Sequence, residues 1–173
     1  MNLDKNQKAL FVMDVDTNLD PILQELPNIS PENILSIQCY GPVISSPYGD
    51  IMKSVIYAIY QENVEEIFVV VPKEKESPSG NSFSQLDSIQ DHIQTLDYLF
   101  QNSNPEFQGG TVQDWLYLKG SGSENINKCV DMIQNHPLVP AQVKVRGLIV
   151  DFVDGDLLVV EVPLEKEEAK LNS

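Results

Sequence analysis

Short apolar runs alternate along this chain with segments of helical periodicity, and this alternation constrains the fold more than any other feature. Continuous apolar runs such as residues 9–13 are typical of strands that are buried on both faces of a sheet. Strands that alternate with helices favour an α/β fold with a mostly parallel sheet. The predicted strands comprise residues 9–13, 34–38, 67–71, 114–118, 143–152 and 157–162.

Helices are predicted over residues 47–62 and 121–135, where apolar residues recur at helical spacing. A further helix is predicted from the apolar stripe Leu86, Ile89, Ile93 and Leu96. Asp154 and Gly155 form a hairpin turn signal between the last two strands, so the final strand is expected to be antiparallel to the one before it. We expect one domain over residues 1–163 and a charged tail over 164–173.

The charge of the chain restricts its partners. The formal net charge is −15 and the isoelectric point is near 4.3. A field of this sign repels phosphate backbones and anionic lipids, so we expect neither a nucleic acid nor a membrane as partner. Residues 1–8 contain no apolar segment, and no apolar run reaches the roughly 20 residues that a membrane span requires. The sequence therefore predicts a cytoplasmic protein.

The cysteines and histidines do not form a recognisable metal-binding spacing. Cys39 and Cys129 are too far apart for a zinc knuckle, and we expect both to be small buried apolar residues. His92 lies beside the stripe of its predicted helix and is expected at the surface or at its boundary. His136 falls at the end of helix 121–135, where a cation would favour the helix dipole, and is expected to be structural.

Two acids directly follow the first predicted strand. In an open α/β sheet, ligands bind beyond the carboxyl ends of the strands, where Asp14 and Asp16 would lie. The segment Asp14-Val15-Asp16-Thr17 resembles the Asp-x-Asp-x-Thr signature of haloacid-dehalogenase-type phosphatases, in which the first acid attacks phosphorus, the second acts as acid and base, and Mg²⁺ neutralises charge. Asp151 and Asp154 could supply the second acidic pair that such an enzyme needs. No lysine is clearly placed after a strand to hold the phosphate, which argues against this reading.

Read as a whole, the chain resembles the small, single-domain β-class carbonic anhydrases. The resemblance spans roughly residues 9–163 in family order. Besides the first strand, three stretches carry it. They are residues 46–58 continuing to 64–70, residues 114–116 followed by 124–140, and residues 143–151 followed by 154, 155 and 157. It implies a three-layer open sheet that is mostly parallel and has a C-terminal antiparallel hairpin strand. It also implies a homodimer or a higher homo-oligomer, because family members commonly associate through their helices.

The positions that correspond to the family's first motif have changed. The family carries Cys-x-Asp-x-Arg after its first strand, and its cysteine is a zinc ligand. The counterpart here begins at Asp14, which replaces that cysteine. Asp16 matches the family aspartate, and Asn18 replaces the arginine.

The remaining zinc ligands have changed as well. The family has a His-x-x-Cys pair after its third strand, and the resemblance places Pro72 at the histidine and Lys75 at the cysteine. In the family's Arg-Asn-Ala-Gly segment only the glycine is retained, as Gly41. Zinc requires three or four thiolate, imidazole or carboxylate donors, and neither proline nor a protonated lysine supplies one. We therefore predict no metal, no cofactor and no catalytic residue at these positions.

A lysine could replace the charge of the missing ion. We expect Lys75 or Lys73 to place its ammonium group near Asp14 and Asp16, because a buried acid pair without compensating charge is unfavourable. Without zinc, no group lowers the pKa of a bound water to near 7, so the hydroxide nucleophile is not formed at neutral pH.

These observations favour a carbonic anhydrase-like protein without a catalytic zinc, which has a binding, regulatory or structural role and whose crevice could hold a small molecule. One alternative is an altered enzyme that uses Asp14 and Asp16, with the Mg²⁺-dependent phosphatase as its best-defined form. The other is residual carbonic anhydrase activity through His92, His136 or Cys39.

Overall fold

The structure, a computed structural model, describes residues 7–15, 17–26, 28–39, 47–73, 90–103, 122–154 and 156–162. The chain divides into two compact units, one formed by residues 1–73 with 121–173 and the other by residues 74–120. The single domain over residues 1–163 stays a prediction. The predicted strand at 114–118 and the predicted tail lie outside the described residues.

The first unit contains a five-stranded sheet with the order β2-β1-β3-β4-β5. β1 pairs in parallel with β2 and β3, β3 pairs in parallel with β4, and β5 is antiparallel to β4. The strands are β1 Lys8–Asp14, β2 Ile34–Cys39, β3 Val64–Pro72, β4 Lys144–Val153 and β5 Asp156–Val162. This arrangement confirms the predicted α/β fold, with a mostly parallel sheet and an antiparallel C-terminal strand.

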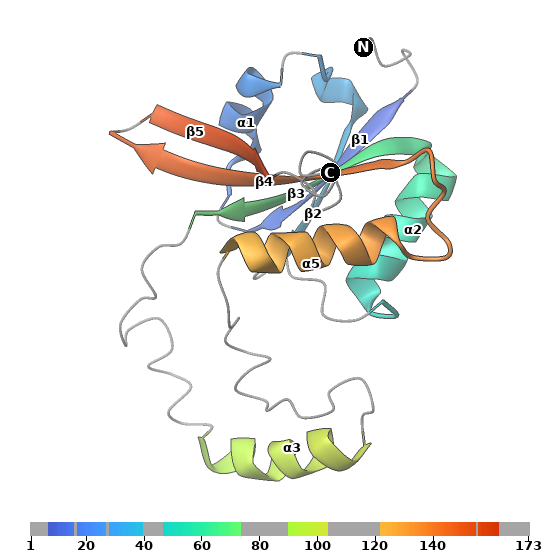
Figure 1. The fold of residues 1–173 in the computed structure, drawn as a ribbon, viewed down its shortest axis with the longest axis vertical. Coiled ribbons are helices and arrows are strands. Elements are labelled where there is room, and N and C mark those ends of the chain that lie inside the picture. Colours follow the sequence, from blue (N-terminus) through green and yellow to red (C-terminus); the bar gives the residue numbers. More distant parts are fainter. Residues whose placement is uncertain are drawn as a thin grey trace, which may run out of the picture. The chain divides into compact units, whose positions relative to one another are not determined.

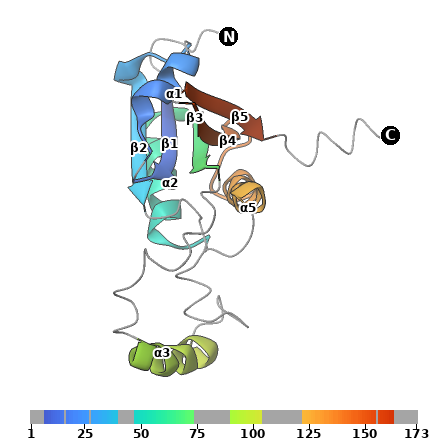
Figure 2. The same ribbon diagram turned by 90° about the vertical axis from the view of Figure 1, so that its left-hand side faces the viewer.

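Helices cover both faces of this sheet (Figure 1). The helices of this unit are α1 Leu19–Glu25, α2 Asp50–Glu62 and α5 Gly122–Gln134, and a 3-10 turn, η1 Pro31–Asn33, precedes β2. α2 and α5 lie on one face and α1 lies on the other, which gives the three predicted layers (Figures 1 and 2). Among the described residues, no helix is long and apolar enough to span a membrane.

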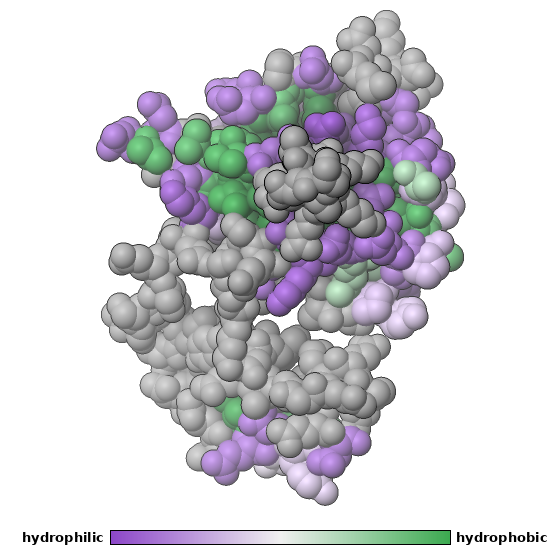
Figure 3. Space-filling view, viewed as in Figure 1, coloured by the Kyte–Doolittle hydropathy of each residue, from purple (hydrophilic) through white to green (hydrophobic). Residues whose placement is uncertain are grey.

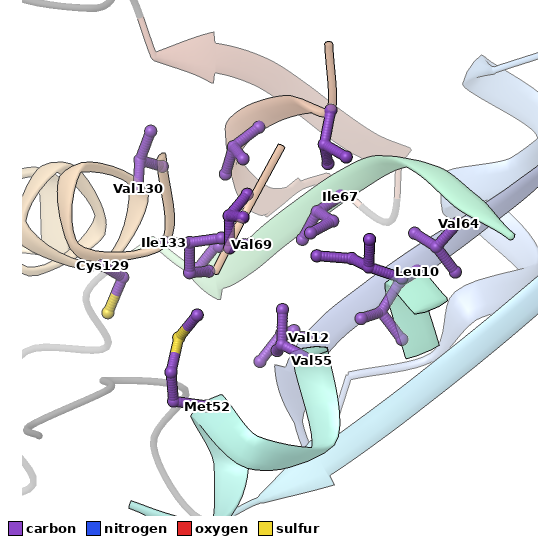
Figure 4. Packing of buried hydrophobic residues seen from close by; sticks show 14 of the residues in the cluster. Leu10, Val12, Met52, Val55, Val64, Ile67, Val69, Cys129, Val130 and Ile133 are labelled. Atoms are coloured by element: carbon purple, nitrogen blue, oxygen red, sulfur yellow. The ribbon is translucent and has the colours of Figure 1, made fainter. Parts of the chain in front are cut away.

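Two apolar clusters separate the layers, because successive side chains of a strand point to opposite faces. On the α2 and α5 side, Val12 and Val69 of the sheet pack with Met52 of α2 and Ile133 of α5 (Figure 4). On the α1 side, the cluster is formed by Ala9, Phe11, Met13, Ile22, Ile29, Phe68, Val70, Leu148 and Val150. β1 and β3 are therefore buried on both faces, which explains their continuous apolar sequences.

A glycine lets α5 approach β4 closely. A Cβ atom at Gly147 would lie 2.9 Å from Cδ1 and 3.0 Å from Cγ1 of Ile126, and 3.5 Å from Cγ2 of Val130. The first two distances are shorter than ordinary van der Waals contacts, so the packing of α5 on β4 depends on the missing side chain.

The helices differ from the sequence-based prediction in several places. α1 and η1 were not predicted, because each is shorter than a typical amphipathic segment. Tyr60 of α2 does not join the buried face of its helix: its side chain is 63% exposed, and its hydroxyl donates to the Leu138 carbonyl oxygen at 2.7 Å. In the second unit, α3 Gln90–Ser103 is described by itself: Ile93 is half-buried, whereas Leu96 of the predicted inner stripe is exposed.

Candidate functional site at the carboxyl ends of the parallel strands

The parallel strands end on the same side of the sheet. In the register, Asp14 of β1 is the partner of Cys39 of β2, and Pro72 of β3 is the partner of Val150 of β4. We call the set formed by Asp14, Cys39, Lys73 and Asp151 the carboxyl rim. Ligands of open α/β sheets bind at this side, which is where the sequence predicts the crevice.

The β1–β2 part of the carboxyl rim is tied together by backbone hydrogen bonds. The amide of Val15 donates to the carbonyl oxygen of Cys39 at 3.1 Å, and the amide of Thr17 donates to the carbonyl oxygen of Asp14 at 3.0 Å. The Cys39 thiol lies 3.8 Å from the carbonyl oxygen of Met13, to which it donates. Both Asp14 and Cys39 are half-buried, so the expectation of a fully buried Cys39 was wrong.

The thiol of Cys39 is held in its protonated form. Burial raises its pKa, and the negative charge of Asp14 raises the pKa further, because both disfavour the thiolate. The thiolate is the form that binds metals and attacks electrophiles. Cys39 is therefore a poor substitute for a zinc-binding cysteine at neutral pH. The sequence pointed to Cys39 only as a possible ligand for residual activity, although its place at the end of a parallel strand next to β1 was a usable signal for this rim.

Asn18 has a local structural role. It stands before α1 with an extended backbone, and its Oδ1 accepts a hydrogen bond from the amide of Asp20 at 3.1 Å. This side chain caps the helix and satisfies one of its free amides. The residue at which the resemblance implies the family arginine thus starts a helix.

The β3–β4 part of the carboxyl rim contains an ion pair. The Lys73 ammonium nitrogen lies 3.2 Å from Oδ2 of Asp151, and the Lys73 amide donates to the Val150 carbonyl oxygen at 2.7 Å. The Lys73 side chain is largely exposed, so this pair contributes little to stability. Lys73 is one of the two lysines that were expected near Asp14 and Asp16, and it forms its ion pair with Asp151.

The acids proposed for a magnesium site have other roles. Asp151 pairs with Lys73, and Asp154 occupies the β4–β5 turn with a left-handed backbone, φ 53°. A non-glycine residue with positive φ is typical of such turns, and Asp tolerates it better than most. The described geometry does not favour the phosphatase arrangement.

The other predicted rim residues, Asp16, Gly41 and Lys75, lie outside the described residues. Across the described ranges, no group of three or more His, Cys, Asp or Glu side chains is arranged to hold a metal ion. Of the described residues at the ends of β1 and β2, Asp14 offers one hard oxygen donor and Cys39 one protonated sulfur, fewer than the three or four donors that zinc requires.

The two histidines and Cys129 lie elsewhere. Cys129 is buried in the core on the α5 side, as expected, and His92 is exposed on α3. His136 is 8% exposed, its Nδ1 accepts from the Leu138 amide at 3.1 Å, and its Nε2 is 3.1 Å from the Pro47 carbonyl oxygen. His136 is therefore structural, but as a hydrogen-bonded link to the start of α2 rather than as an exposed cation at a helix end.

Known proteins share both the sequence and the fold. The chain is 57% identical over 163 residues to YbcF of Bacillus subtilis, which is named as carbonic anhydrase-like, and the match covers 94% of this chain and 92% of YbcF. No protein-family model matches the chain.

Solved structures give the same assignment of the fold. A β-carbonic anhydrase of Trichomonas vaginalis aligns with a TM-score of 0.58 at 19% identity, over 94% of this chain and 87% of that chain. One of two tetrameric β-carbonic anhydrases from Sordaria macrospora aligns with a TM-score of 0.53 at 14% identity, over 91% and 82%. With the fold, the sheet order and the 57% identical relative in agreement, the chain belongs to the β-class carbonic anhydrase family.

Proposed function

We propose that this chain is a carbonic anhydrase-like protein that carries no catalytic zinc and does not hydrate carbon dioxide. Its role is then binding, regulatory or structural. The observation that supports this most directly is the end of β3. The strand ends in Pro72, at the position where the resemblance implies a zinc-binding histidine, and the next residue directs its ammonium group to Asp151.

The chemistry of the carboxyl rim supports the same proposal. The family reaction depends on a zinc-bound water whose pKa is lowered to near 7. Asp14 offers an oxygen donor at the former cysteine position, and the raised pKa of Cys39 opposes thiolate formation beside it. A zinc ion at this rim would lack the soft donors that the family uses.

The same proposal includes the environment and the assembly of the protein. We place it in the cytoplasm, as a homodimer or higher homo-oligomer without nucleic acid or membrane partners. Its net charge of −15 disfavours polyanions. Its structural neighbour from Sordaria macrospora is tetrameric, which supports self-association. The carboxyl rim remains the place where a small molecule would bind.

Metal analysis tests the proposal. Protein purified without chelator is expected to contain no stoichiometric zinc and to show no carbon dioxide hydration above the buffer rate. The variant Asp14→Cys/Pro72→His/Lys75→Cys restores the family donors and serves as the matched control, because it is expected to gain zinc on the same scaffold. One tightly bound zinc ion per chain in the unmodified protein would overturn the proposal.

A phosphatase screen with Mg²⁺ separates the altered enzyme from the inactive relative. The unmodified protein is expected to show no turnover. Turnover that disappears in Asp14→Asn, with zinc still absent, would support the altered enzyme instead.

A further inference from the structure

The β4–β5 hairpin carries a half-exposed apolar strip on one face of the sheet. Val162 and Ile149 pack at the margin of the apolar cluster on the α2 and α5 side. Val160 and Leu158 lie two and four residues from Val162 on β5, so their side chains project from that same face. They are 48% and 51% exposed, and we call this pair the hairpin strip. Figure 3 shows hydrophobic residues gathered where Figure 1 places the hairpin.

The helices on this face leave room beside α5. α2 packs on β1 and β3, and α5 packs chiefly on β3 and β4. A helix is about 10 Å across and strands lie about 4.8 Å apart, so one helix covers about two strands. α5 meets the hairpin at Gly147, the register partner of Val162, whereas Leu158 lies about 14 Å further along β5. Among the described elements, none covers the hairpin strip.

The sequence that follows β5 has the pattern of a short amphipathic helix. This segment, residues 163–173, lies outside the described residues and reads Pro-Leu-Glu-Lys-Glu-Glu-Ala-Lys-Leu-Asn-Ser. Proline is favoured at the first helical position, leucine, glutamate, lysine and alanine are good helix formers, and asparagine often follows the last turn. Leu164 and Leu171 are seven residues apart and share one helical face. Because an isolated helix of this length is marginal in water, it requires a surface to pack on.

We propose that residues 163–172 form a helix that folds back along β5 and packs Leu164 and Leu171 on the hairpin strip. The occupant of the strip is then a segment of the same chain, tethered directly to the end of β5. Tethering gives it a high effective concentration, so a small apolar contact suffices. This inference goes beyond the proposed function, and it holds for any zinc content and any number of subunits.

The reach of the segment fits the strip. A helix from Pro163 to Leu171 rises about 12 Å, and β5 spans about 14 Å from Val162 back to Leu158. Leu171 therefore comes level with Leu158, while Leu164 stays beside the Val162 end of the strand. Packing both leucines on the strip removes apolar surface from water, which is the driving force that the helix lacks by itself.

The charged residues of the segment are compatible with this position. Lys166 and Lys170 fall on the helical face opposite to the two leucines. Glu168 falls between the leucines, and at β5, the edge strand of the described sheet, its carboxylate can reach water. Leu158 is the register partner of Asp151, so the docked segment ends level with this residue of the carboxyl rim. The segment thus borders the β4 side of the place where a small molecule would bind.

Amide hydrogen exchange of the full chain tests the docking. We expect the amides of residues 167–171 to exchange about tenfold more slowly than in a free peptide of the same sequence. Leu158→Ser is expected to remove most of this protection, and Glu168→Leu, which completes the apolar face, to increase it. Lys166→Leu is the matched control, because it adds the same side chain on the opposite face and is expected to change nothing.

The amides that bond β5 to β4 report whether the hairpin is intact in each variant. Segment amides that exchange like the free peptide in the unmodified chain would overturn the proposal. So would protection that Leu158→Ser leaves unchanged while the hairpin is intact. Protection that is lost on dilution would assign the strip to a second copy and would also overturn it.

A disulfide locates the end of the segment. In the background Cys39→Ser/Cys129→Ala, the pair Leu158→Cys with Leu171→Cys is expected to form a disulfide within one chain on mild oxidation, because the two Cα atoms come within about 6 Å. Leu158→Cys with Lys166→Cys is the matched control, and its yield is expected to be much lower. Equal yields for the two pairs, or a disulfide that forms only between chains, would contradict the docking.

Discussion

At the scale of single residues, the chemistry of the carboxyl rim depends on the protonation of the Cys39 thiol. The thiol is half-buried at the end of β2, and Asp14 is its register partner at the end of β1. Burial and the adjacent carboxylate act in the same direction, and both raise the pKa of Cys39. The resemblance implies a zinc-binding thiolate at the end of β1, whereas this rim disfavours a thiolate beside that strand end.

Alkylation of Cys39 as a function of pH measures this effect. Iodoacetamide reacts with the thiolate, so the pH midpoint of the rate follows the pKa of the thiol. In a Cys129→Ala background, which leaves one thiol, the midpoint is expected above that of an ordinary cysteine. Asp14→Asn removes the second cause and is expected to lower the midpoint part of the way, since burial remains. A midpoint that rises in Asp14→Asn would contradict the assignment of the causes.

The same raised pKa predicts how stability depends on pH. Because the pKa of Cys39 is higher in the folded than in the unfolded state, the folded state holds the proton more tightly. This contribution to the free energy of unfolding is complete below the unfolded pKa and is lost as the pH rises through the folded pKa. Urea unfolding from neutral to alkaline pH is expected to show the loss, and Cys39→Ser is expected to remove it. Equal slopes in both proteins would rule the linkage out.

At the scale of elements, hydrogen bonds and close packing fix the helices on the sheet. His136 follows the end of α5, and its ring contacts the carbonyl oxygen of Pro47, which lies shortly before the start of α2. Gly147 sets the distance between α5 and β4. Both contacts link segments that are far apart in sequence. Both can be tested by substitution of the residues involved.

His136→Ala is expected to destabilise the protein by about 1–3 kcal/mol, because it leaves the Leu138 amide and the Pro47 carbonyl group without their ring partners. His92→Ala is the matched control: His92 is the other histidine of the chain and is exposed on α3, so its change is expected to stay within about 0.5 kcal/mol. The free energy of unfolding from urea titration is the measurement. Similar effects of the two substitutions would disprove the link between α5 and α2.

Gly147→Ala is expected to cost about 1–3 kcal/mol, because its methyl group would overlap Cδ1 of Ile126. Adding Ile126→Val removes that Cδ1 atom, so the double variant is expected to lose less stability than the sum of the two single substitutions. Additive losses in the double-mutant cycle would show that α5 and β4 do not meet at this point.

Elements with a clear local sequence pattern could be predicted, and elements without one could not. The strands at β1 and β3 were predicted because apolar runs that are buried on both faces are unambiguous. α1 was missed because it has seven residues, although the Asn18 cap with Asp20 was a usable signal. The pairing of Lys73 with Asp151 follows from the β3–β4 register, which no local pattern specifies. Lys73 thus pairs with Asp151, whereas Lys75, the other lysine that was expected near Asp14 and Asp16, lies outside the described residues.

At the scale of the whole molecule, the excess of acids acts on stability as well as on partner choice. The chain has 26 acidic and 11 basic side chains, which leaves a formal net charge of −15. Such an excess destabilises the compact state through self-repulsion. Ion pairs such as Lys73 with Asp151 and Lys8 with Glu62 are exposed, and exposed pairs contribute about 0–1 kcal/mol each. Repulsion is therefore expected to outweigh the pairs.

Added salt should consequently stabilise this protein at neutral pH. Raising NaCl from about 0.01 M to about 0.1 M shortens the screening length from about 30 Å to about 10 Å, which weakens repulsion across the whole surface. We expect the melting temperature at pH 7 to rise with NaCl and the rise to shrink as the pH approaches the isoelectric point near 4.3, where the net charge falls to zero. KCl should act like NaCl, because screening depends on ionic strength and not on the cation. A melting temperature that falls with salt at pH 7 would mean that attractive ion pairs dominate, against the charge count.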